Sequence, residues 1–140
     1  MDDYLFFQSA EKWLSLLYPR NWEKLIVEGI PAFFDPEGNG ALQIYALENK
    51  EKKYDLDEEM ERYLAIHGQS GKEIQTVILT NEVGYDIKAA EFKKDDRFWI
   101  IFMISNKGSK MILATYNCDE IIDEMTAIKI TNTISSIRIQ

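Results

Sequence analysis

Short apolar runs alternate with charged or turn-forming segments along the chain, a pattern typical of several strands interrupted by helices. In the first part of the chain, strands are predicted at residues 13–18, 22–27, 32–34 and 41–47. Pro19, Arg20 and Asn21 predict a turn between the first two strands, because proline fixes φ and asparagine tolerates the left-handed region. The next two strands are expected to be joined by the loop at residues 35–40.

A helix is predicted at residues 56–67. Asp55 is a favourable N-cap, and Glu58 follows three residues later, which is the spacing of a capping box. Gly68 is expected at the C′ position, where the chain leaves the helix in the left-handed conformation. The apolar face of this helix is formed by Met60, Tyr63, Leu64 and His67.

Four more strands are predicted after this helix, at residues 74–80, 84–92, 97–105 and 110–116. The last three are expected to form an antiparallel meander, with turns at residues 93–96 and 106–109. Residues 97–105 are nearly all apolar, so they predict a central strand that is covered on both faces. Such a strand requires a helix on each side of the sheet, or a helix on one side and folded-over chain on the other.

A second helix is predicted at residues 119–136, with Asn117 as its N-cap and Glu120 as the capping-box partner. Its broad apolar stripe consists of Ile121, Ile122, Met125, Ile128, Ile130, Ile134 and Ile137. The order of strands, helix, strands and helix predicts an α+β fold. We expect an antiparallel β-sheet of about six to seven strands flanked by two helices.

Composition supports one folded unit. The chain has 140 residues, of which 46% are hydrophobic and 29% charged, so we expect residues 1–140 to form a single domain. The net charge of -8 argues against nonspecific binding to nucleic acid or to an anionic membrane. No apolar stretch approaches the length of a membrane span, and the acidic N-terminus does not resemble a secretory signal. These features and a single cysteine, Cys118, predict a cytoplasmic protein.

A family resemblance rests on the opening segment that ends in Tyr18-Pro19-Arg20-Asn21-Trp22. In the PsbP-like family a short strand likewise ends in an aromatic-Pro-x-x-Trp turn. The hairpin at residues 32–44, the helix, the meander and a C-terminal helix ending in Ile134-Ser-Ser-Ile137 complete the resemblance. It covers almost the whole chain as topology, and only the turn carries it in sequence. It implies a bacterial member of a fold that serves mostly in non-enzymatic binding domains.

The sequence assigns no catalytic, cofactor-binding or metal-ligating residue. The only histidine, His67, is interpreted as a cation at the end of a helix, where it interacts with the helix dipole. Cys118 would begin the second helix, where a thiol pKa can fall, but Asp119, Glu120 and Asp123 oppose a thiolate. Cys118 is therefore interpreted as structural. The five acidic residues at the start of the first helix, Asp55, Asp57, Glu58, Glu59 and Glu61, are interpreted as a solvated helix terminus.

Three weaker sequence motifs do not support a functional site. Asp35, Glu37, Asn39 and Gly40 match the start of a calcium loop, but its twelfth position is Ala46, so a hairpin loop is favoured. The segment 68–72 lacks the spacing of a phosphate loop. Ser70, Ser105, Ser109, Ser135 and Ser136 lie in no nucleophile elbow.

Aromatic residues make up 12% of the chain and include Trp13, Trp22 and Trp99. Most are expected in the core, while the run that contains Tyr4, Phe6 and Phe7 is expected to dock on the domain or on another chain. The leading hypothesis is a non-catalytic adaptor or chaperone that binds a protein partner. A small-ligand or lipid-binding module with an aromatic pocket, and an enzyme that uses carboxylates alone, remain open. A homodimer is also open, although the sequence identifies no sheet edge and no binding surface.

Overall fold

The computed structural model describes residues 3–11, 13–51, 53–69 and 74–140, which form ten strands and two helices. The strands are β1 (Tyr4–Gln8), β2 (Leu14–Pro19), β3 (Glu23–Val27), β4 (Ile30–Phe34), β5 (Ala41–Glu48), β6 (Thr76–Thr80), β7 (Asp86–Lys94), β8 (Arg97–Ser105), β9 (Lys110–Cys118) and β10 (Arg138–Ile139). The helices are α1 (Leu56–Ile66) and α2 (Glu124–Ser135). The predicted α+β class is confirmed.

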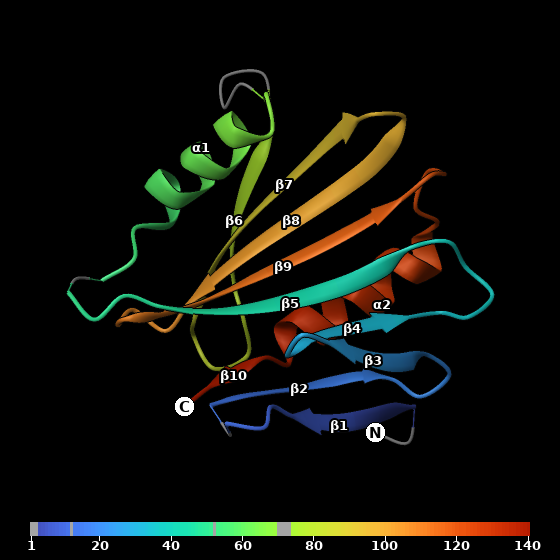
Figure 1. Ribbon diagram of the computed structural model, residues 1–140, viewed down its shortest axis with the longest axis horizontal. Coiled ribbons are helices and arrows are strands. Elements are labelled where there is room, and N and C mark those ends of the chain that lie inside the picture. Colours follow the sequence, from blue (N-terminus) through green and yellow to red (C-terminus); the bar gives the residue numbers. More distant parts are fainter. Residues whose placement is uncertain (1–2, 12, 52, 70–73) are drawn as a thin grey trace.

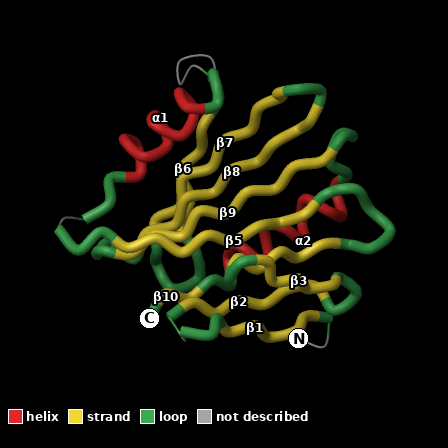
Figure 2. Tube along the Cα trace, viewed as in Figure 1, coloured by secondary structure: helices red, strands yellow, loops and turns green. Residues whose placement is uncertain are grey.

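The strands form two antiparallel sheets. The larger has seven strands in the order β3-β4-β5-β9-β8-β7-β6, and the smaller has three in the order β1-β2-β10. The segment from β7 to β9 is the predicted meander, and β6 extends it by pairing with β7. Strand β5 pairs with β9 along its whole length. Figure 1 shows α1 and α2 on opposite sides of the larger sheet, with the smaller sheet beside β3 and β4. Figure 2 shows the same arrangement along the Cα trace.

Strand β8 is buried on both faces, as its apolar sequence predicts. Ile100, Phe102 and Ile104 belong to one core cluster, which also contains buried residues of α2 and of the smaller sheet. Ile101 and Met103 point to the other face and belong to a second cluster, which contains the buried residues of α1. Because successive side chains of a strand alternate in direction, an unbroken apolar run needs cover on both sides.

The caps of α1 follow the sequence prediction closely. Asp55 is the N-cap, and its carboxylate accepts the N–H groups of Asp57 at 3.0 Å and Glu58 at 3.3 Å. The reciprocal half of the predicted capping box differs, because the Glu58 carboxylate instead pairs with Arg62 at 3.1 Å. A local ion pair one turn away has therefore replaced the bond back to the N-cap.

The C-terminal end of α1 is one residue shorter than predicted. His67 is the C-cap and Gly68 has a φ of 72°, the left-handed conformation expected at C′. Gly68 donates to the Ala65 carbonyl at 3.0 Å, and Gln69 donates to the Leu64 carbonyl at 2.7 Å. These two bonds are the Schellman pattern, so glycine ends this helix for the predicted physical reason.

The predicted start of the second helix is wrong. Residues 117 and 118 belong to β9, because Asn117 faces Trp99 and Cys118 faces Phe98 across the β8–β9 pair. The Asn117 side chain accepts a hydrogen bond from Arg97 Nε at 2.7 Å instead of capping a helix. The N-cap is Asp123, whose carboxylate accepts the Thr126 N–H at 2.7 Å.

Both ends of the chain form strands that the sequence did not predict. The segment at residues 4–8 forms β1, which pairs with β2 over its full length, so the expected docking of this run onto the domain is confirmed. Phe7 is buried against Phe33 in an edge-to-face contact at 5.4 Å. The turn after Pro19 is present, with the Trp22 N–H donating to the Pro19 carbonyl at 3.0 Å, but it passes the chain from one sheet to the other. The short strand β10 was not predicted and pairs with β2.

Replacing Asp123 with alanine is expected to lower the free energy of unfolding measurably, because the Thr126 N–H then loses its cap. Chemical denaturation measures this value. Asp119→Ala is the matched control, since Asp119 is exposed and lies in the loop before α2. Equal losses in the two variants would contradict Asp123 as the cap.

Candidate functional site

His67 lies at the end of α1 within an aromatic cluster. Its ring stacks on Tyr63 with centroids 4.4 Å apart, and Trp99 lies at 6.2 Å. The Lys94 ammonium is 3.4 Å from Nδ1. Burial, and then the charge of Lys94, lower the pKa of His67. The position at a helix end is as predicted, while the lowered pKa disfavours the cationic form on which the interpretation of His67 depends.

Cys118 is buried at the end of β9 rather than exposed at a helix terminus. Its Sγ donates to the Glu120 carbonyl at 2.9 Å. Burial raises the pKa of the thiol, which disfavours the reactive thiolate. The structural interpretation of this cysteine is therefore consistent with its surroundings.

The acidic residues at the start of α1 are engaged locally. Asp55 caps the helix, Asp57 pairs with Lys88 of β7, and Glu58 and Glu59 both pair with Arg62. These local contacts agree with the interpretation of this segment as a helix terminus.

The loop at residues 35–40 is a hairpin loop between β4 and β5. Asp35 accepts the Glu37 N–H at 2.9 Å, and Gly40 leaves no room for a Cβ beside Tyr116. Over the described parts of the chain, no group of three His, Cys, Asp or Glu side chains is arranged to hold a metal ion. Residues 70–72 of the rejected phosphate motif lie outside the described residues. None of the described helices is long and apolar enough to cross a membrane.

The most unusual exposed feature is strand β6, at one edge of the larger sheet. Three successive large apolar side chains are exposed there: Val77 by 52%, Ile78 by 69% and Leu79 by 44%. No charged residue occurs from Ile74 to Asn81. Edge strands carry unpaired backbone groups and are normally protected by charge, proline or a bulge. β6 therefore has the properties of an edge strand that can pair with a further strand.

The other edges of the described sheets are better protected or smaller. Strand β3 exposes Leu25, Ile26 and Val27 but also carries the charges of Glu23 and Lys24. In β1, Phe6 is the only large apolar side chain that is strongly exposed. Strand β10 has two residues. Only β6 among these edges combines three exposed large apolar residues with a lack of charge.

A groove of about 400 Å³, here called the α2 groove, lies beside one face of β6. Val77 and Leu79 line it from the edge strand, Phe102 lines it from β8, and Ala127 and Thr131 line it from α2. Further apolar side chains extend the surface along the helix, since Met125 is 61% exposed and Ile128 is 47% exposed. An apolar segment laid along β6 would find apolar cover on this side.

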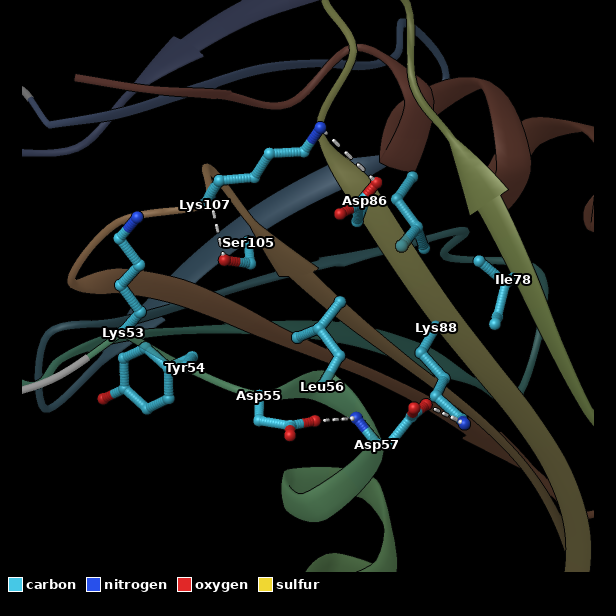
Figure 3. A pocket seen from close by; sticks show the side chains of 11 residues that line it. Lys53, Tyr54, Asp55, Leu56, Asp57, Ile78, Asp86, Lys88, Ser105 and Lys107 are labelled. Atoms are coloured by element: carbon cyan, nitrogen blue, oxygen red, sulfur yellow. Dashed lines mark hydrogen bonds and ion pairs between the residues drawn. The ribbon is translucent and has the colours of Figure 1, made fainter.

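A second groove of about 420 Å³, the α1 groove, lies on the opposite face of β6 (Figure 3). Figure 3 shows Ile78 on β6, while Lys88 reaches from β7 to Asp57 at the start of α1. Lys107 lies 4.0 Å from Asp86 across the same groove. These two ion pairs involve four of the charged side chains that line the groove, and Ile78 is the apolar side chain that β6 contributes to it. Alternate side chains of β6 enter two different grooves.

Sequence reasoning predicted β6 as a strand but did not find this surface. The signal was present in the run Thr76-Val-Ile-Leu-Thr80, which carries no charge in a chain of net charge -8. This run indicates a binding surface only if the strand is known to lie at the edge of the sheet. That position follows from the pairing order, which the pattern of one strand cannot reveal.

Comparison with known proteins shows the fold and nothing more. No protein-family model and no curated protein matches the chain. A solved structure of a protein from Bacteroides thetaiotaomicron VPI-5482 is similar, with a TM-score of 0.69 and 16% sequence identity. The match covers 99% of this chain and 49% of that chain, so this chain spans about half of its length.

His67 is expected to make the fold more sensitive to acid. Its pKa is lowered in the folded protein, so unfolding takes up a proton as the pH falls through the unfolded value of about 6.5. The free energy of unfolding should fall less between pH 7.5 and 5.5 in His67→Phe than in the wild type. Denaturation at the two pH values measures this difference.

An NMR titration of the His67 ring provides the control. Because His67 is the only histidine, its signal is unambiguous. A pKa at or above 6.5 in the folded protein would contradict the expected direction.

Proposed function

We propose that this protein is a non-catalytic, cytoplasmic protein-binding adaptor or chaperone that adds an extended segment of a partner to the free edge of β6. The observation that carries the proposal is the uncharged apolar edge at Val77, Ile78 and Leu79. Strand addition satisfies the backbone groups of the edge, while alternate side chains of the added segment supply specificity.

The two grooves define the chemistry of the segment that would fit. A strand added beside β6 would direct alternate side chains towards the α2 groove and the α1 groove. Both positions present apolar contacts from β6, so small or β-branched apolar side chains are favoured. The net charge of -8 disfavours an acidic segment at this edge and favours an uncharged or basic one.

The PsbP-like resemblance and the bacterial origin remain predictions that agree with this proposal. That fold serves mostly in binding domains, although a fold alone does not determine function.

A ligand-binding role is the alternative, and one cavity supports it. A cleft of about 570 Å³ lies between the two sheets and is lined by Phe7, Trp13 and Tyr45. Its volume and aromatic lining suit a small apolar molecule. Native mass spectrometry of the purified protein would show an added mass if such a ligand were retained.

Binding of a short synthetic peptide of alternating valine and threonine, with a lysine at each end, tests strand addition. Fluorescence anisotropy with labelled peptide and dilute protein is expected to show saturable binding. The double variant Val77→Lys, Leu79→Lys should weaken it by more than about tenfold, because both apolar contacts to the α2 groove are lost.

The matched control is Leu25→Lys, Val27→Lys on β3, where the exposed fractions are 54% and 55%. It adds the same charge to the opposite edge and should leave the affinity unchanged. Absence of binding to the wild type, or equal weakening in both double variants, would contradict the proposal.

A further inference from the structure

The β6 sequence is self-complementary in the antiparallel sense. Reading Thr76-Val77-Ile78-Leu79-Thr80 backwards gives threonine, leucine, isoleucine, valine and threonine. If two copies of this strand run antiparallel about Ile78, threonine faces threonine, Val77 faces Leu79, and Ile78 faces itself. Every facing pair is thus of matching polarity, which is the arrangement that stabilises cross-strand contacts.

Paired over its full length, strand β3 lacks this property. Antiparallel self-pairing of β3 about Leu25 would place Lys24 opposite Ile26 and Glu23 opposite Val27. Each facing pair on either side of the centre would join a charge to an apolar side chain. Self-pairing of β1 about Phe6 would be less favourable than β6 because Phe7 is already buried within its own domain.

We propose that the partner accepted by the β6 edge is a second copy of this chain, paired antiparallel through β6 about a two-fold axis at Ile78. This inference rests on the proposed function, because it names the partner at the same edge. It produces one continuous antiparallel sheet from the larger sheets of both copies.

The two-fold axis also brings the flanking apolar surfaces together. Facing side chains of an antiparallel pair lie on the same side of the sheet, so Val77 of one copy contacts Leu79 of the other beside the α2 grooves. The exposed Met125 and Ile128 extend this apolar surface on each copy. An isologous contact of this kind closes on itself and does not propagate into a filament.

Charge favours this edge over the rest of the surface. Each copy carries a net charge of -8, so two copies repel one another at long range. The stretch from Ile74 to Asn81 carries no charge, so pairing through it brings no like charges into contact. Added salt should therefore strengthen the dimer by screening the distant charges.

Analytical ultracentrifugation over a range of protein concentrations tests the association. The wild type is expected to show a monomer–dimer equilibrium without larger species. Ile78→Lys places two lysines opposite one another at the axis and should raise the dimer dissociation constant by more than about tenfold. Ile26→Lys makes the same substitution at an exposed position of the edge strand β3 and should leave the dimer dissociation constant unchanged.

Disulfide trapping tests the two-fold register. Facing residues of an antiparallel pair have Cα atoms about 4.5–5.5 Å apart, within disulfide range. In a Cys118→Ala background, Ile78→Cys should form a covalent dimer when oxidised by diamide. Val77→Cys and Leu79→Cys should form one efficiently only when the two variants are mixed, because residue 77 faces residue 79.

Each outcome decides between the alternatives. A monomer at all concentrations, or a dimer that Ile78→Lys does not weaken, overturns this inference. A dimer that Ile78→Lys weakens but that Ile78→Cys does not trap overturns the register. If the wild type is monomeric and still binds the valine–threonine peptide, the proposed function stands and only the second copy is excluded as partner.

Discussion

Burial of both faces of β8 is the constraint from which the architecture follows. Ile101 and Ile104 are completely buried on opposite sides of this strand, so each side of the sheet must be covered. Helix α1 covers one side, and α2 with the smaller sheet covers the other. Truncating one such residue to alanine costs about 2–5 kcal/mol, a large part of the stability of a typical domain. The open antiparallel sheet that contains β8 ends in two edge strands, β3 and β6.

Local chemistry made much of this fold predictable. The bounds of β8 and the caps of α1 were correct because an apolar run, Asp55 and Gly68 each carry a strong local signal. The start of α2 was not predictable, since Asn117, Asp119 and Asp123 are all good caps. Pairing of Asn117 with Trp99 across the sheet decided among them. Residues 4–8 were likewise predicted to dock, but only the pairing with β2 makes them a strand.

The candidate site was less predictable because it is a property of topology. The sequence shows that residues 76–80 form an apolar strand, and a strand of this kind would ordinarily be expected inside a sheet. Its place at the edge exposes the backbone and three apolar side chains between two grooves. By contrast, His67, Cys118 and the acidic start of α1 lie in local contacts that explain them structurally.

The free edge of β6 is the pairing surface that we propose for this protein. Residue-resolved hydrogen–deuterium exchange of Thr76–Thr80 at low and high protein concentration tests it most directly. At low concentration, we predict that only alternate amides are protected, because those facing β7 are hydrogen-bonded and the others are free. At high concentration, the free amides should become protected as well. Exchange from these amides that stays fast and independent of concentration would contradict the claim.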